Sequence, residues 1–368
     1  MSARLHALHA AGQSLWLDYI DRTMLSNGDL TRRIAEDALT GMTSNPTIFE
    51  KALAEGAAYD EQLATVDAAL SDREAFFALA TTDVRNACDA FRLVYDRTEG
   101  QDGYVSLEVS PDLARDAAGT VAEARRLWQI VDRPNLMIKV PGTVEGAEAI
   151  RQLIADGINV NVTLLFSVAA HARVIEAYIA GLEQRAAAGQ PIDRIGSVAS
   201  FFVSRVDSAI DKQLGGMGPD AQALQGKAAI ANAKLAYRLF QASFSGPRWA
   251  PLAAKGARVQ RPLWASTSTK NPAYRDVIYV EELIGPDTVN TLPPATLEAF
   301  RDHGEVRASV TEQVADAERA LAALEATGVS LQHVTDTLLA EGLASFEQSF
   351  VTLLAGLARK RAALAATA

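Results

Sequence analysis

The sequence predicts an α/β fold, and within that class a (β/α)8 TIM barrel with additional C-terminal helices. Three observations lead to this prediction. Eight short strand-like runs alternate with longer segments rich in Ala, Leu, Arg and Glu. The apolar residues of those longer segments recur at helical spacing, and the alternation is typical of repeated βαβ units. The strand-like runs are apolar or mixed rather than cleanly alternating, as buried parallel strands are. A doubly wound open sheet is the alternative that the same pattern allows.

The predicted elements follow one another along the whole chain. The strand-like runs are Leu15–Tyr19, Thr40–Thr43, Tyr104–Val109, Leu136–Val140, Asn159–Leu164, Ser197–Phe201, Leu263–Ser266 and Val277–Val280. The segments with helical spacing are Leu30–Ala38, Glu61–Leu70, Arg73–Asp96, Ala114–Trp128, Gly146–Ala155, Val168–Ala187 and Ala221–Phe244, with three more after Pro294. The stretch 294–368 has no strand pattern, so we expect a helical extension packed on the barrel. We therefore expect residues 1–368 to form a single barrel domain.

The charge balance limits the partners of this protein. It has 35 Lys and Arg against 45 Asp and Glu, a formal net charge of −10, while 49% of its residues are hydrophobic. That is enough apolar material for a large core. An acidic chain without a long basic run is a poor ligand for nucleic acid or anionic membranes, because both require phosphate charge to be neutralised. An anionic substrate therefore needs a local basic pocket.

The sequence also indicates a cytoplasmic protein. The single cysteine, Cys88, cannot form an internal disulfide, and residues 1–20 lack the basic and then apolar pattern of a secretory signal. No apolar stretch approaches the roughly 18 residues of a membrane-spanning helix. We expect small-molecule partners, with no nucleic-acid or membrane partner.

Metal, hydride and serine-hydrolase chemistry are not indicated. No Gly-x-Ser-x-Gly, P-loop or dinucleotide-binding motif occurs, and the glycine-rich segment 215–219 lacks the strand-to-helix setting of a phosphate loop. With one cysteine, the scattered histidines give no zinc pattern. These histidines are His6, His9, His171, His303 and His333.

The strongest single candidate for chemistry is Lys139, within the apolar run Leu136–Gly142. Burying a lysine is unfavourable unless its amine finds a polar partner or loses its proton, and a buried neutral amine is a nucleophile. The plainer interpretation is a lysine that extends from the strand end to solvent. The residue pattern by itself leaves both interpretations open.

Other polar residues lie near the ends of predicted strands. Asn161 and Thr163 are two positions apart, so on a strand they point to the same side. Facing a barrel interior, they form a buried hydrogen-bond network or serve a function. Asp18 and Glu108 are carboxylates near strand ends, where barrel enzymes collect their catalytic groups. Each alone is more simply a solvated acid or a helix cap, but together with Lys139 they favour a site.

The segment Thr43–Pro46 places Asn45 at the exit of a predicted strand. Asn-Pro is a turn signal, and the residue before a proline avoids the helical region, so a simple turn is one interpretation. The segment also follows a strand and precedes the helix-like Thr47–Lys51. Asn45 is therefore in a position to face a site at the strand ends.

Four segments resemble blocks of the transaldolase family. Gly41–Phe49 resembles its N-terminal signature, and Met137–Thr143 resembles its Schiff-base lysine motif. Asn159–Ser167 and Ser197–Arg205 are similar to two further blocks. The resemblance extends from about Leu15 to the C-terminal helices. It is closest to the longer-chain subfamily that also occurs fused to phosphoglucose isomerase, and this chain is too short to contain that second enzyme.

The resemblance implies a class I, Schiff-base (β/α)8 enzyme that uses no metal or organic cofactor. Such enzymes move a dihydroxyacetone unit from sedoheptulose 7-phosphate or fructose 6-phosphate to an aldose phosphate. By position in the motifs, Lys139 would form the iminium and Asp18 would take the C4 hydroxyl proton. Glu108, through a water held by Thr163, would manage proton transfers during carbinolamine formation and dehydration.

The same resemblance implies how the substrate is held. Asn45 and Asn161 would bind the substrate hydroxyls and the three-carbon intermediate, and Ser200 would line the pocket. Arg205 matches the family's phosphate-binding arginine, whose fixed guanidinium suits a phosphate.

The remaining phosphate block departs from the family pattern. In the segment Ala265–Pro272, Ser268 and Lys270 have the spacing of the expected Ser-x-Arg, with lysine in place of arginine. Ser266 is the alternative serine. The substitution puts the affinity for phosphorylated sugars in question more than the chemistry.

Two other functions stay open at the level of sequence. A fructose 6-phosphate aldolase would use the same lysine but release dihydroxyacetone to water, although such aldolases are much shorter chains. A non-catalytic sugar-phosphate-binding protein on a decayed barrel is disfavoured, because Asp18, Glu108, Lys139 and Thr163 are all intact. Dependence on an acceptor sugar distinguishes the first alternative.

Overall fold

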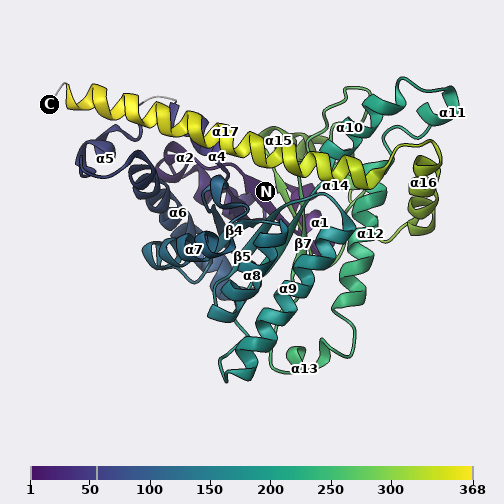
Figure 1. Cartoon of the computed structure of the whole chain (residues 1–368), viewed down its shortest axis with the longest axis horizontal. Helices are drawn as coiled ribbons and strands as arrows, with labels where there is room; N and C mark the ends of the chain where they lie inside the picture. Colours follow the sequence, from purple (N-terminus) through teal and green to yellow (C-terminus); the bar gives the residue numbers. More distant parts are fainter. Residues whose placement is uncertain (1, 55–56, 367–368) are drawn as a thin grey trace.

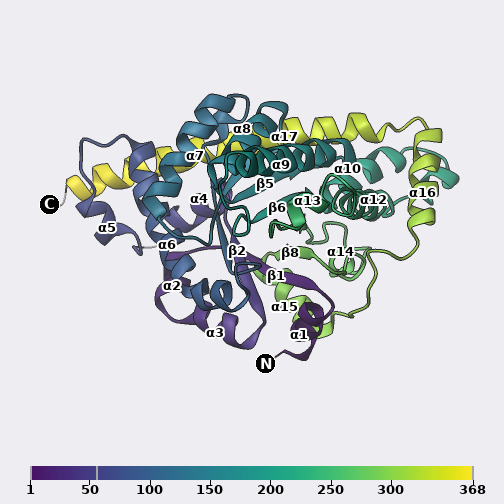
Figure 2. The same ribbon diagram turned by 90° about the horizontal axis from the view of Figure 1, so that it is seen from below.

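The computed structural model describes residues 2–54 and 57–366 and contains a closed barrel of eight parallel strands in the order β1 to β8 (Figure 2). Each strand pairs with its neighbour in sequence, and β1 pairs with β8 to close the ring. The strands are β1 (Gln13–Asp18), β2 (Leu39–Thr43), β3 (Tyr104–Glu108), β4 (Leu136–Pro141), β5 (Val160–Leu165), β6 (Ser197–Phe202), β7 (Arg261–Ala265) and β8 (Thr288–Leu292). The predicted fold class is confirmed.

The first seven predicted strands overlap observed ones, but the eighth prediction is wrong. Val277–Val280 does not form a strand, and the short helix α14 (Ile278–Glu281) lies there instead. The run is apolar because Val277, Tyr279 and Val280 are buried, and a four-residue apolar run does not distinguish a buried helix from a strand. The true eighth strand, Thr288–Leu292, has three polar side chains, which hid it.

Helices cover the outside of the barrel between successive strands (Figure 1). They are α1 (Ala3–Ala10), α2 (Arg22–Ser26), α3 (Asp29–Glu36), α4 (Pro46–Ala54), α5 (Asp60–Thr65), α6 (Asp72–Arg97), the 3-10 turn η1 (Pro111–Leu113), α7 (Ala117–Val131), α8 (Val144–Asp156), α9 (Val168–Ala187), α10 (Ser204–Leu214), α11 (Pro219–Gln222), α12 (Ala228–Ser243), α13 (Ala250–Ala253), α14, α15 (Pro294–His303), α16 (Val314–Ala326) and α17 (Leu331–Ala365). No helix in the described part of the chain is long and apolar enough to cross a membrane.

Capping residues explain why helices begin shortly after two of the site strands. Thr143 accepts a hydrogen bond from the Gly146 backbone N–H at the start of α8, and Ser167 does the same for Ala170 at the start of α9. Both satisfy donors that a helix leaves unpaired in its first turn. The threonine that follows Lys139 in its motif and the serine that follows the β5 segment therefore have structural roles.

The middle of the barrel is filled. Trp16 on β1 is fully buried, and its indole lies against Gly41 on β2, where an added Cβ would come within 2.5 Å of the ring. The indole N–H donates to Asp102 Oδ1 at 2.8 Å. A barrel packed in this way is a core and not a pore, so ligands are confined to its two ends.

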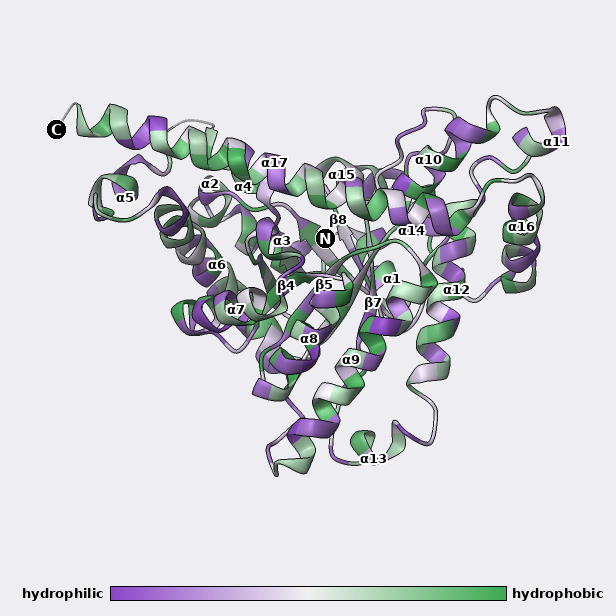
Figure 3. Ribbon diagram, in the orientation of Figure 1, coloured by the Kyte–Doolittle hydropathy of each residue, from purple (hydrophilic) through white to green (hydrophobic). Residues whose placement is uncertain are grey.

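The 35-residue helix α17 lies across the carboxyl-terminal ends of the strands, shown in yellow in Figure 1. Purple and green alternate along its length in Figure 3, as expected of a helix with one face on the barrel. The Thr47 and Ser349 hydroxyls hydrogen-bond at 2.9 Å, and Arg361 pairs with Asp72 at 2.7 Å. The additional C-terminal helices are therefore observed, and α17 forms part of the roof over the barrel mouth.

Candidate active site

A cavity of about 220 Å³ opens at the carboxyl-terminal ends of the strands. Eight of the predicted site residues line it, and they are Asp18, Asn45, Lys139, Thr163, Ser200, Arg205, Ser268 and Lys270. The other two, Glu108 and Asn161, are buried behind the wall, in contact with lining residues. The topology therefore brings together side chains from β1, β4, β5 and β6, from the first turn of α10 and from the loops that follow β2 and β7.

Lys139 on β4 is held with its amine inside the barrel mouth. Its side chain is only 6% exposed, and Nζ donates to the backbone carbonyl of Ser44 at 3.0 Å. Nζ also lies 3.1 Å from Glu108 Oε2 and over the ring of Phe346, 5.9 Å from its centroid. The amine is thus buried beside a carboxyl group and does not extend to solvent.

The two carboxyl groups near Lys139 both retain protons more readily than usual. Burial raises the pKa of Glu108, the neighbouring Lys139 opposes the rise, and the charge on Asp18 adds to it. Burial likewise raises the pKa of Asp18, against the lowering effects of Lys139, of a hydrogen bond from Thr43 and of Arg205. Carboxyl groups with raised pKa values suit proton transfer near neutral pH.

Asn161 on β5 is part of a buried network and not of the cavity wall. Its Nδ2 donates to Ser106 Oγ at 2.9 Å, and its Oδ1 accepts from Ser200 Oγ at 2.7 Å. The buried-network interpretation therefore describes Asn161, while Ser200 is its partner on the wall.

Thr163 on β5 faces the cavity at the point where the strand becomes irregular. The pairing with β6 shifts register between Val162 and Leu165, and Leu164 adopts a φ of 59°, a bulge of the kind common beside active sites. Thr163 Oγ1 is buried and has no hydrogen-bond partner among the described residues. A buried hydroxyl of this kind is a ready position for a water or substrate group.

The far end of the cavity is basic. Arg205, in the first turn of α10, lies over the Phe202 ring, and Lys270 Nζ donates to Ser268 Oγ at 2.7 Å. Neither cation forms an ion pair with any residue in the described ranges. Burial lowers the pKa of Arg205, and burial together with the charge of Arg205 lowers the pKa of Lys270. This is the local basic pocket that an acidic protein needs for an anionic substrate.

Both candidate serines of the phosphate block line the cavity. Ser266 directly follows β7 with a φ of 54°, and its hydroxyl lies 3.1 Å from that of Ser204. Ser268 lies two residues further along and bonds to Lys270. The geometry brings both serines to the basic end.

Sequence reasoning missed several lining residues. Thr43 Oγ1 donates to Asp18 Oδ1 at 2.7 Å and lies 2.6 Å from Thr291 Oγ1. Thr291 was missed because the eighth strand was predicted at Val277–Val280. Thr43 lies in the segment Gly41–Phe49, but the sequence indicated no role for it. Phe346 on α17 gave no signal, because an aromatic residue on an amphipathic helix is usually core.

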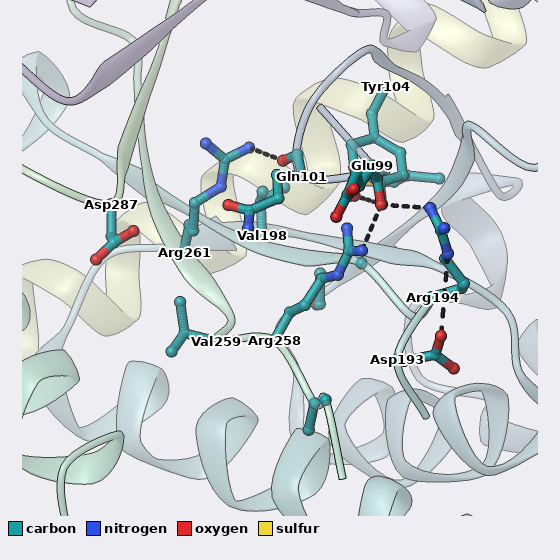
Figure 4. A pocket seen from close by; sticks show the side chains of 16 residues that line it. Glu99, Gln101, Tyr104, Asp193, Arg194, Val198, Arg258, Val259, Arg261 and Asp287 are labelled. Carbon is teal, nitrogen blue, oxygen red and sulfur yellow. Dashed lines mark hydrogen bonds and ion pairs between the residues drawn. The ribbon is translucent and has the colours of Figure 1, made fainter. Parts of the chain in front are cut away.

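A second, larger cavity of about 470 Å³ lies at the opposite, amino-terminal end of the strands (Figure 4). Its charged residues are Arg194, Arg258, Arg261, Glu99, Asp193 and Asp287. Arg194 and Arg258 both donate to the carbonyl of Glu99, and Arg261 donates to that of Gln101. These guanidinium groups tie loops together, and three carboxylates balance them. Size alone therefore does not make this cavity the active site, and barrel enzymes use the other end.

Fold and site together define a class of protein. A barrel with a buried lysine at its carboxyl-terminal mouth, two carboxyl groups of raised pKa nearby and a cationic end to the cavity has the groups typical of enzymes that act through a lysine imine. In the described part of the chain, no cluster of three or more His, Cys, Asp or Glu residues has the arrangement of a metal site.

Comparison with known proteins identifies the family within this class. A family model described as Transaldolase/Fructose-6-phosphate aldolase matches residues 15–357. A curated protein named Transaldolase from Frankia alni is 51% identical to this chain, over 98% of this chain and 98% of its own. One from Thermobifida fusca is also 51% identical, over 99% of this chain and 100% of its own. One from Thiobacillus denitrificans is 51% identical over 94% of this chain and 96% of its own. The chain belongs to the transaldolase/fructose-6-phosphate aldolase family.

Proposed function

We propose that this enzyme is a cytoplasmic transaldolase of the non-oxidative pentose phosphate pathway. It transfers a dihydroxyacetone unit from sedoheptulose 7-phosphate or fructose 6-phosphate to glyceraldehyde 3-phosphate or erythrose 4-phosphate. The observation that carries this proposal is the position of Lys139. It lies on the wall of a cavity with a basic end, and its buried amine is 3.1 Å from Glu108 Oε2. The near-full-length similarity to proteins named Transaldolase supports it.

In the first step Lys139 Nζ attacks the ketose carbonyl. The carbinolamine that forms must lose water to become an iminium, and a proton must reach the departing oxygen. Glu108 is the nearest acid, and its raised pKa allows it to carry that proton. The unpartnered Thr163 Oγ1 supports the assignment of a water there that relays the proton.

In the second step Asp18 takes the proton from the C4 hydroxyl and the C3–C4 bond breaks. The bonding electrons move into the iminium, which becomes an enamine on Lys139, and an aldose phosphate leaves. An acceptor aldose then reverses these events, and Asp18 returns the proton. The basic neighbours of Asp18 oppose the effect of burial on its pKa, so an ionised form is available to act as base.

The remaining residues hold the substrate. Arg205 and Lys270 bind the phosphate at the basic end, with Ser266 or Ser268 beside them. Asn45 has its Oδ1 occupied by the Ile48 backbone N–H, so its amide nitrogen is the group that faces substrate hydroxyls.

Ser200 is the group proposed to hold hydroxyls of the bound three-carbon unit. Ser200 Oγ lies on the cavity wall and donates to Asn161. Asn161 therefore orients the Ser200 hydroxyl through this hydrogen bond. This role differs from the direct substrate contact that the family motif implies for Asn161.

The test is borohydride reduction in the presence of fructose 6-phosphate without acceptor, followed by intact mass spectrometry and peptide mapping. We expect a reduced three-carbon adduct on Lys139. Lys139→Met should abolish it, whereas Lys234→Met, which replaces another lysine with a buried side chain, should leave it in place. A six-carbon adduct would indicate binding without cleavage, and no adduct would favour a non-catalytic binding protein. Acceptor-dependent turnover then separates transfer from simple aldol cleavage.

A further inference from the structure

The ring of Phe346 is the aromatic surface nearest the lysine amine. It belongs to α17, is 5% exposed, lines the cavity and has Lys139 Nζ over its face, 5.9 Å from the centroid. Phe202, the other aromatic residue on the wall, instead faces the guanidinium of Arg205 at 5.3 Å. The two rings therefore serve opposite ends of the cavity.

The helix holds Phe346 in a fixed place. Gly342, Phe346 and Phe350 are spaced by four residues and so share one face of α17. Below Phe346, Gly342 lies so close to Leu164 that an added Cβ would come 3.0 Å from its side chain. Above it, Phe350 packs edge to face on Phe76 at 5.6 Å. These contacts clamp the helix on both sides of the Phe346 ring.

We propose that Phe346 determines whether the enzyme transfers or hydrolyses, by shielding the three-carbon intermediate on Lys139 from water. This inference rests on the proposed function. The intermediate is lost when C3 takes one proton and water adds to C2. A C2–O bond forms, the C2–N bond breaks, one proton of that water goes to Nζ, and its other proton replaces the one given to C3. Dihydroxyacetone then leaves.

The ring opposes this loss by limiting the access of water. Its apolar face over Nζ leaves less room for a water molecule beside the C2–N bond, so water reaches C2 less readily. Transfer then outcompetes hydrolysis, because the intermediate survives until an acceptor arrives.

The experiment compares Phe346→Leu with Phe350→Leu, the same substitution one turn along the same helix and outside the wall of the cavity. The readout is the ratio of free dihydroxyacetone to transferred product at saturating acceptor, which a general loss of active enzyme does not change. Phe346→Leu should raise that ratio by roughly tenfold. Phe350→Leu should lower thermal stability to a similar degree and leave the ratio at the wild-type value.

The outcomes separate this inference from the proposed function. If the wild type forms no adduct on Lys139, the proposed function itself fails. If the adduct forms but Phe346→Leu has the wild-type ratio, the role of Phe346 is refuted. An equal increase in Phe350→Leu would also refute it, because the position of the helix and not the ring would then be responsible. Phe346→Met provides the same comparison if the leucine variant does not fold.

Discussion

Thr43 favours the ionised form of Asp18 through one hydrogen bond. Its Oγ1 donates to Asp18 Oδ1 at 2.7 Å and lowers the pKa of a carboxyl group that burial raises. Thr43→Val removes the donor, so the pKa of Asp18 should rise further. Because the role proposed for Asp18 is that of a base in its ionised form, the acid limb of kcat/KM should move to higher pH by about one unit, as expected for a hydrogen bond to a charged group. A pH–rate profile measures this shift.

Thr291→Val is the matched control for that variant. It removes the hydroxyl that lies 2.6 Å from Thr43 but leaves the Thr43–Asp18 hydrogen bond in place. Its acid limb should stay closer to that of the wild type. Equal shifts in both variants would indicate a general disturbance of the mouth rather than control of Asp18.

Arg205 carries the second prediction for a single residue. Its guanidinium is half-buried at the basic end without an ion-pair partner in the described part of the chain, so it is available to a phosphate. Arg205→Ala should raise KM for phosphorylated donors by about 10- to 100-fold, the range of a lost charge-assisted hydrogen bond or two. Steady-state kinetics with an unphosphorylated ketose should show little change. A parallel loss for both donors would mean that Arg205 does not bind the phosphate.

The predictability of the site residues depends on how unusual each is in its setting. An amine or a carboxylate on an apolar strand is conspicuous, so Lys139, Asp18 and Glu108 were recognisable from the sequence. Threonine is common in strands and phenylalanine in amphipathic helices, so Thr43 and Phe346 were not. Their importance comes from which side chains they meet in space, and no spacing along the chain reveals that.

At the level of elements, seven strands were predictable, β5 included despite Asn161 and Thr163, whereas the more polar β8 was not. β8 reads Thr-Val-Asn-Thr-Leu, and its polar side chains form hydrogen bonds with neighbouring segments, as when Thr267 Oγ1 donates to Asn290 Oδ1 at 3.0 Å. The hydrophobic periodicity of the sequence does not reveal such hydrogen bonds. The bulge at Leu164 was equally invisible, because a single positive φ leaves no compositional mark in a leucine-rich strand.

The contact between β1 and β2 gives a prediction at this scale. Gly41→Ala places a methyl group within 2.5 Å of the Trp16 indole, which must move and weaken its hydrogen bond to Asp102. Overpacking of this kind should lower the free energy of unfolding by about 1–3 kcal/mol. Denaturant titration measures it. Gly218→Ala, where nothing lies within 4 Å of the added Cβ, should be close to neutral.

For the whole molecule, we propose that the chain unfolds as one domain and that His171 contributes to the pH dependence of its stability. His171 on α9 is fully buried, its two ring nitrogens have no partner among the described residues, and burial lowers its pKa to about 4. As pH falls from 6.5 to 4, His171 binds a proton in the unfolded chain but stays neutral in the folded one. The free energy of unfolding should therefore fall by on the order of 3 kcal/mol from this residue alone.

The comparison with His171→Leu isolates this effect. Asp207, whose pKa burial raises to about 6, acts in the opposite direction: its contribution to stability is largest at low pH and is lost as pH rises from 3.8 to 6. The difference between the wild type and His171→Leu cancels that contribution. Equal pH dependence of unfolding in the two proteins would contradict the prediction, and more than one calorimetric transition would contradict a single domain.

The trio of Asp18, Thr43 and Thr291 spans the seam where the first strand meets the last, and it joins side chains 248 residues apart in sequence. Contacts at such separation form late, because the entropy of closing the intervening chain must be overcome first. An open sheet that had already gathered the strand of Lys139 with its neighbours would possess the amine but lack the base. During refolding, the regain of turnover should therefore follow the return of the helical circular dichroism signal. Enzyme activity would then be a measure of barrel closure.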